Sequence, residues 1–139
     1  MKLYLFILSH VFALFATNAA ELPQNDKNLH MGVASCAASM CHGSIISREG
    51  SDVLQNEYII WSREDAHSQA YQTLLSAESK KIADKLGLDN AATAAVCLDC
   101  HSDNVATEYQ SDKFQISDGV GCESCHGGAE HYLSSHTNS

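Results

Sequence analysis

The stretch Cys122-Glu123-Ser124-Cys125-His126 decides how the rest of the chain is interpreted. Two cysteines three positions apart, followed at once by a histidine, form the attachment pattern for c-type haem. Both thiols of such a motif bond to the haem vinyl groups, and the adjacent histidine becomes an axial ligand of the iron. The pattern recurs at residues 97–101 (CLDCH) and, with two extra residues, at 36–42 (CAASMCH). The sequence therefore predicts three covalent haems.

All six cysteines belong to these motifs, and none is left over. Three disulfides are one alternative, and a zinc ribbon is another, because the spacing of the second and third motifs nearly fits one. Neither explains why a histidine follows the second cysteine each time. We therefore favour haem c and its iron as the cofactor. The predicted attachment thiols are Cys36, Cys41, Cys97, Cys100, Cys122 and Cys125, and the predicted proximal ligands are His42, His101 and His126.

Further histidines are available to bind the irons from the opposite side. Bis-histidine ligation of three haems needs three distal ligands, and outside the motifs and the N-terminal twenty residues the chain offers His30, His67, His131 and His136. His131 and His136 follow the third motif closely, so either would more easily reach a neighbouring haem than the haem of His126. Met31 and Met40 are alternative sulfur ligands, which would raise the reduction potential.

Residues 1–20 have the three parts of a secretory signal peptide. Lys2 supplies the positive charge, residues 3–15 are mostly apolar, and residues 17–20 are small enough for cleavage after Ala19 or Ala20. The alternative is an uncleaved membrane anchor, but the apolar run is shorter than the ~20 residues that a bilayer requires. We expect a periplasmic protein with no stable membrane span, in which residues 21–139 form one multihaem domain.

The charge balance narrows the choice of partners. The chain has 17 acidic and 8 basic side chains and a formal net charge of −9, and loss of Lys2 with the signal makes it one unit more negative. Nucleic-acid binding needs a basic surface, so that class of function is not expected. An acidic surface suits either simple solubility or steering toward a basic redox partner.

The pattern of the sequence predicts a mainly α-helical fold with irregular loops, whose core is largely haem. We expect one helix to begin at Ser62, capped with Asp65, because an apolar stripe at three-four spacing follows. Its members are His67, Ala70, Tyr71, Leu74 and Leu75. Within that stripe His67 is predicted to be an axial ligand, because the expected core is mostly haem.

Two further helices are expected before the second motif. One covers residues 79–86 and ends at Gly87, and the other covers residues 91–95 after a cap at Asn90. Residues 102–119 are polar and read as an irregular connection. Short helices and few aromatic residues indicate that the chain needs its cofactors to complete a core.

Several stretches together resemble the cytochrome c-554 family of multihaem c-type cytochromes. They are residues 30–43, 55–71, 97–101 and 119–127. The resemblance implies periplasmic electron transfer with redox partners such as a dehydrogenase, a quinol oxidase module or a terminal reductase. It also implies distal roles for His67, His136 and His30, and none for His131. Since the best-known members carry four haems, the chain could be the N-terminal part of a longer protein.

Two main classes of function remain, and they differ in the coordination of the iron. A carrier needs closely spaced haems whose irons are saturated by two histidines. A haem-dependent oxidoreductase acting on a small nitrogen or sulfur compound needs one five-coordinate iron with proton donors beside it, and a haem-based sensor also needs an open iron. We favour the carrier, because the histidines suffice for every iron and no compact acid–base cluster stands out.

Overall fold

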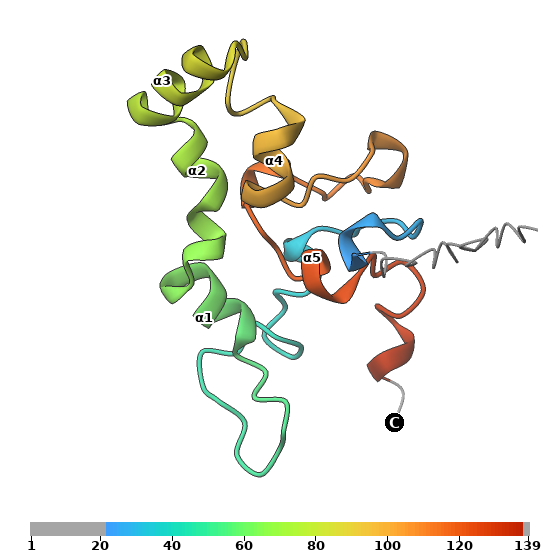
Figure 1. Ribbon diagram of the computed structural model, residues 1–139. Coiled ribbons are helices and arrows are strands. Elements are labelled where there is room, and N and C mark those ends of the chain that lie inside the picture. Colours follow the sequence, from blue (N-terminus) through green and yellow to red (C-terminus); the bar gives the residue numbers. More distant parts are fainter. Residues whose placement is uncertain (1–21, 138–139) are drawn as a thin grey trace, which may run out of the picture.

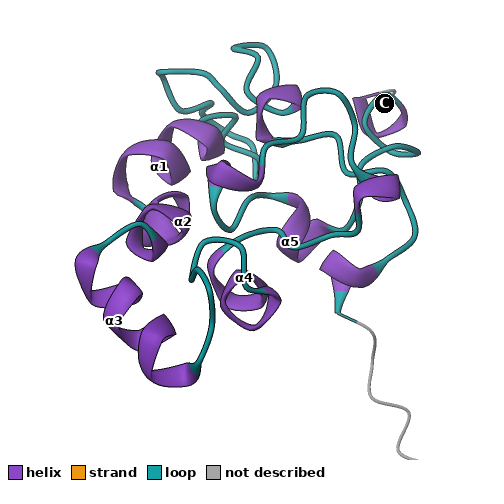
Figure 2. Cartoon of the chain, turned by 90° about the horizontal axis from the view of Figure 1, so that it is seen from above, coloured by secondary structure: helices purple, strands orange, loops and turns teal. Residues whose placement is uncertain are grey.

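The computed structural model describes residues 22–137, so the predicted signal peptide lies outside the described residues. Within them the chain consists of helices joined by irregular connections, and its extended pairing is a single isolated bridge between His30 and Gln110 (Figures 1 and 2). This confirms the predicted mainly α-helical class. The α-helices are α1 (Glu57–Glu64), α2 (Ala70–Leu74), α3 (Ala77–Leu86), α4 (Ala95–His101) and α5 (Glu123–His126). The 3-10 helices are η1 (Pro23–Asn25), η2 (Val33–Ser35), η3 (Ala66–Gln69), η4 (Thr107–Tyr109), η5 (Ile116–Asp118) and η6 (Ser135–Thr137).

Helices α1, α2 and α3 follow one another along one side of the molecule, and α4 lies beside α2 (Figure 1). The predicted start at Ser62 is wrong, because Ser62 lies inside α1 and donates its hydroxyl to the carbonyl of Ile59. Asp65 is extended and ends α1, and its side chain accepts the backbone N–H of His67 at the start of η3. The expected single helix is thus broken at Asp65, because its carboxylate offers the backbone a local partner.

The prediction for the next helix is confirmed at its C-terminus. Helix α3 ends at Gly87, whose φ of 70° is the left-handed conformation that glycine adopts without strain. It begins two residues earlier than expected, because the hydroxyl of Ser76 accepts the backbone N–H of Ser79 as an N-cap.

The short helix predicted for residues 91–95 is wrong. Asn90 does accept the backbone N–H of Ala92, but residues 91–93 form only a turn, and Ala94 is extended. The helix begins at Ala95 instead and carries the whole second motif. Residues 102–119 are irregular, as predicted, with two short 3-10 helices.

A small apolar cluster joins α2, α3 and α4. Its buried members are Leu74, Ala83, Ala91, Ala92 and Leu98. Elsewhere in residues 22–137 several large apolar side chains are exposed, among them Met40, Ile45, Ile46, Leu75, Leu86 and Val96. A chain that buries so little apolar surface gains little hydrophobic stabilisation from its own side chains. Among the described helices none is both long and apolar enough to span a bilayer.

Candidate haem sites

The three motifs have different local structures. The third motif forms one helical turn, α5, and the second lies in α4, so that each histidine follows its cysteines along a helix. The first motif folds as a tight turn, in which the N–H of Cys41 reaches the carbonyl of Ala38 and the N–H of His42 reaches that of Cys36. Its two extra residues are accommodated by this turn. The histidine thus directly follows the second cysteine on a helix in two motifs and on a turn in the first.

None of the six motif cysteines forms a disulfide in this structure. The thiols of Cys36 and Cys122 are close enough to influence each other's pKa, so the first and third motifs lie side by side. The neighbouring Cys122 thiol, together with burial, raises the pKa of the Cys36 thiol. Over residues 22–137, one group of three or more potential metal-binding side chains converges, and it contains no cysteine. The zinc-ribbon alternative is therefore not supported.

The rings of His42 and His136 face each other although the residues are far apart in sequence. Their centroids are 6.2 Å apart, and the ring planes differ by only 3°. Nδ1 of His42 lies 2.9 Å from Oε2 of Glu57, and Nδ1 of His136 donates to the carbonyl of Tyr132 at 2.8 Å. With Nδ1 engaged in both rings, each Nε2 is left as the nitrogen available to a metal.

Tyr132 holds the segment that carries His136. Its hydroxyl donates to the carbonyl of Gly127, directly after the third motif, and its ring packs edge-on against His136 with centroids 6.0 Å apart. Burial, with nearby acidic groups, raises the pKa of Tyr132 to about 12. The chain thus leaves the third motif and delivers His136 to the first.

His101 is oriented by helix α2. Its Nδ1 lies 3.0 Å from the carbonyl oxygen of Ala70 and 3.0 Å from the hydroxyl oxygen of Thr73. The Thr73 hydroxyl also donates to the Ala70 carbonyl at 2.7 Å. The two groups that contact Nδ1 of His101 are therefore held in place, and both are uncharged. The second motif is therefore positioned by the helix that precedes it.

His67 lies at the junction of η3 and α2, with its side chain 65% exposed. Its Nδ1 is 2.9 Å from Oδ1 of Asp65, and its carbonyl accepts the N–H of Val120 just before the third motif. Gly119 makes this approach possible, since a Cβ there would lie 2.5 Å from the His67 carbonyl oxygen. Of the predicted apolar stripe, Leu74 is buried, whereas His67 faces outward with Nε2 available.

His30 is fully buried and belongs to a polar cluster that the motifs alone do not predict. Its Nδ1 lies 2.8 Å from Oδ2 of Asp103, and its Nε2 has no hydrogen-bond partner among the described residues. Burial lowers the pKa of His30, but the hydrogen bond and charge of Asp103 outweigh that effect, with help from Glu123 and Asp26, and raise it overall. A buried imidazole nitrogen without a partner is what an unfilled metal-ligand position presents.

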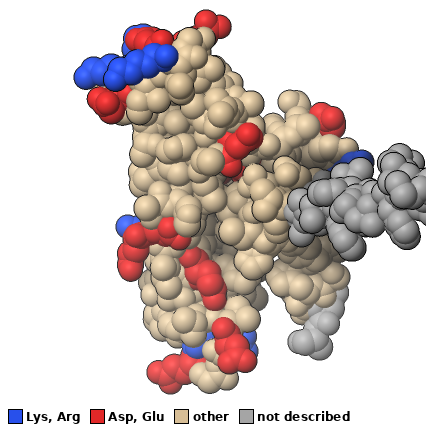
Figure 3. Space-filling view, viewed as in Figure 1, with Lys and Arg blue, Asp and Glu red and all other residues tan. Residues whose placement is uncertain are grey.

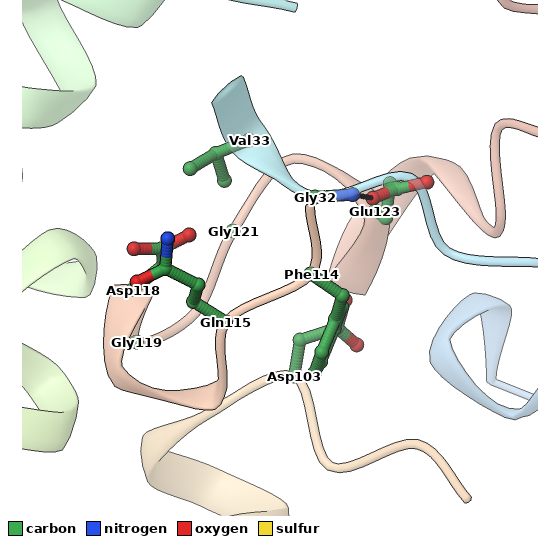
Figure 4. Close-up of a pocket in the computed structure, with 9 residues that line it drawn as sticks. All are labelled: Gly32, Val33, Asp103, Phe114, Gln115, Asp118, Gly119, Gly121 and Glu123. Atoms are coloured by element: carbon green, nitrogen blue, oxygen red, sulfur yellow. Dashed lines mark hydrogen bonds between the residues drawn. The ribbon is translucent and has the colours of Figure 1, made fainter. Parts of the chain in front are cut away.

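Glu123, between the two cysteines of the third motif, is a buried carboxylate that joins distant segments. It accepts backbone N–H groups from Met31, Gly32 and Ala129 at 2.7 to 2.8 Å. Figure 4 shows its bond to Gly32 beside a small hollow of about 10 Å³, enough for roughly one water molecule. The hollow is too small for a haem. Glu123 acts here as a clamp, which means that its carboxylate holds three backbone N–H groups from two segments together. Burial also raises the pKa of Asp118, which lines the same hollow.

The remaining predicted ligands are on the surface. His126 is exposed, and His131 is 75% exposed with Nε2 3.8 Å from the Glu130 carboxylate. On the face drawn in Figure 3, the largest group of basic side chains lies over α3, to which Lys80, Lys81 and Lys85 belong, and acidic side chains are spread over the whole face, α3 included. The structure therefore brings together His42 with His136 and Cys36 with Cys122, and leaves His131 apart.

Three pairs of thiols, each followed by an imidazole, on a fold with little apolar core are typical of a c-type cytochrome. The family model described as "Cytochrome c554 and c-prime" matches residues 35–127, and the chain belongs to that family. It is therefore a haem-based electron-transfer protein with covalent haem c and iron, and it works with redox partners. No curated protein and no solved structure matches the chain significantly.

Proposed function

We propose that the chain is a periplasmic electron carrier with three covalent haems, each bound by two histidines. The proposed attachment thiols are the six motif cysteines, and His42, His101 and His126 are the proximal ligands. His136, His67 and His30 are the proposed distal ligands, and His131 is the weakest candidate. When bound, each haem supplies a one-electron Fe(III)/Fe(II) couple.

The pair formed by His42 and His136 is the observation that carries this proposal. Metal–imidazole bonds of about 2 Å, with the radius of each ring added, place the centroids of two trans imidazoles about 6 Å apart. The observed separation is 6.2 Å, with nearly parallel rings. Offset-stacked rings can have the same centroid separation. What supports a metal position between these rings is that Nδ1 is engaged in both of them, which leaves both Nε2 atoms for a metal. An iron held on both sides has no position for a substrate, which favours the carrier over the oxidoreductase.

The nearby histidines provide a matched test. His136→Ala should open one iron, whereas His131→Ala should not, because His131 is 75% exposed and takes no part in the pair. In the purified holoprotein we expect wild type and His131→Ala to be entirely low-spin and unresponsive to carbon monoxide. His136→Ala should show one high-spin haem that binds it. A high-spin component in the wild type would contradict the carrier and favour the oxidoreductase.

The number of haems is tested separately by mass spectrometry of the denatured protein. Thioether bonds survive denaturation, so the mass of three haems should remain on the chain. If only two are retained, the stretched first motif is the one to examine, by testing whether Cys36→Ala with Cys41→Ala lowers the count further. An unchanged count would show that the first motif carries no haem.

A further inference from the structure

The first and second motifs differ in what holds their proximal histidines. His42 has a carboxylate at Nδ1, since Oε2 of Glu57 is 2.9 Å away. His101 has only neutral acceptors there, namely the carbonyl of Ala70 and the hydroxyl of Thr73, both at 3.0 Å. The two ligands therefore have different electronic environments although their motifs belong to one pattern.

Glu57 is fixed in place by hydrogen bonds to both of its carboxylate oxygens. It is the first residue of α1, and its second oxygen, Oε1, accepts the backbone N–H groups of Leu54 and Gln55 at 2.9 and 3.1 Å. With one oxygen held by these two backbone groups and the other beside His42, the carboxylate has few alternative positions.

A carboxylate at Nδ1 strengthens an imidazole as a ligand. By drawing the Nδ1 proton toward itself it raises the basicity of Nε2, and charged acceptors do this more strongly than neutral ones. A more basic ligand stabilises Fe(III) relative to Fe(II), and such hydrogen bonding is one means by which a protein sets a haem potential. The negative charge of the carboxylate acts in the same direction.

We infer that Glu57 is a positioning residue that gives the haem at the first motif a lower reduction potential than the haem at the second. This inference rests on the proposed ligation by His42 and His101. The inference ranks these two haems by reduction potential. An electron shared between them would reside mainly on the haem at the second motif, because its potential is higher. It also assigns a role to an acidic residue that lies outside every haem motif.

Removing the charge of Glu57 tests the inference in one direction. Glu57→Gln keeps the size of the side chain and an oxygen for the Leu54 N–H, and Glu64→Gln removes the same charge from the exposed far end of the same helix. In potentiometric titrations of the holoprotein, we expect one transition of Glu57→Gln to move to higher potential. That transition should belong to the haem that becomes high-spin in His136→Ala. Glu64→Gln should match the wild type.

Adding a negative charge beside His101 tests the inference in the other direction. This test does not depend on whether Glu57→Gln folds. Thr73→Asp places a carboxylate where the hydroxyl now meets His101, and Gln72→Asp adds the same charge at the neighbouring exposed position. Thr73→Asp should lower the potential of a different transition from the one that Glu57→Gln raises. Gln72→Asp should shift it much less.

The outcomes separate this inference from the proposal on which it rests. If Glu57→Gln titrates like Glu64→Gln while both remain low-spin, Glu57 does not tune the site and the inference is overturned. If Glu57→Gln fails to load its haems, equal curves for Thr73→Asp and Gln72→Asp overturn it. A high-spin wild type contradicts the proposed ligation itself, which spectra reveal before any titration.

Discussion

The helices around the second motif and the segments around the first and third motifs are held together by different kinds of contact. Helices α2, α3 and α4 share a cluster of buried apolar side chains, centred on Leu74 and Leu98. The third motif is joined to the segment before the first motif through the buried carboxylate of Glu123, and the buried pair of His30 and Asp103 joins that same segment to the residues after the second motif. One region is a small conventional core, and the other, the clamped region, is held by polar contacts around the predicted haem ligands.

This difference indicates where the chain depends on charge. Apolar contacts in the helical region tolerate changes of hydrogen bonding but not of volume. In the clamped region each buried donor and acceptor depends on a specific partner, so the loss of one partner leaves the other unsatisfied in a low-dielectric environment. Substitutions that remove a carboxylate and substitutions that remove an apolar side chain should therefore affect different parts of the molecule.

The largest effect is expected from Glu123→Ala. Three backbone N–H groups lose their acceptor, and each buried donor left unsatisfied costs about 1–3 kcal/mol, so the free energy of unfolding should fall by about 3 kcal/mol or more. Thermal unfolding followed by circular dichroism measures the loss. Hydrogen exchange should accelerate at residues 31–32 and 129, with α3 unchanged.

Glu108→Ala is the matched control, because Glu108 is exposed and the same chemical change removes no buried contact. It should stay within about 0.5 kcal/mol of the wild type. Equal losses for Glu123→Ala and Glu108→Ala, or exchange that accelerates equally in α3, would remove the distinction between the two regions.

Leu74→Ala should have the next largest effect, and it should act on the other region. Truncating a buried leucine costs about 2–5 kcal/mol, and a cluster this small can relax, so we expect a value of about 2 kcal/mol. Leu75→Ala is the control, since Leu75 is 59% exposed and adjacent. Hydrogen exchange should accelerate in α3 and α4 but not at the Glu123 clamp. Acceleration at the clamp instead would show that the regions are coupled.

Much of the chain was predictable where the signal is local. The mainly α-helical class followed from periodicity, and the end of α3 followed from Gly87, because left-handed backbone strongly favours glycine. The predictions failed where a side chain offers the backbone a competing bond. Asp65 breaks the expected helix in this way, and the turn after Asn90 delays the next helix to Ala95.

The groups that orient the histidines were not predictable from motifs. Asp103 meets His30 from 73 positions away, and Glu57 meets His42 from 15 positions away. Glu123 lies inside a motif, yet its three donors come from two other segments. Acidic residues are common in this chain, so nothing in the sequence distinguishes those that become buried. The haem-ligand assignments themselves stay predictions until the spectra are measured.

Ser76→Ala should have a smaller effect, confined to α3. Loss of the bond from the Ser79 N–H to the Ser76 hydroxyl removes an N-cap, which costs about 1 kcal/mol. Ser76→Asp keeps a capping oxygen and should preserve the wild-type Tm. If Ser76→Asp is as unstable as Ser76→Ala, capping is not what the serine contributes. A loss of haem in either variant would extend the effect beyond the helical region.

The smallest effect on Tm is expected from Asp118→Asn. This substitution tests whether the negative charge of Asp118 destabilises the clamped region. Burial raises the pKa of Asp118, so the folded chain holds its proton more tightly than the unfolded chain does. The stability from that proton is complete below the ordinary aspartate pKa of about 3.9 and is lost as the pH rises through the raised value. Asp118→Asn should therefore increase Tm slightly at pH 7, and the gain should shrink toward acidic pH, whereas exposed Asp112→Asn should show no such trend. A decrease in Tm at pH 7 would mean that the Asp118 carboxylate is stabilised in the fold, and the polar clamps would then extend to every buried acid of this region.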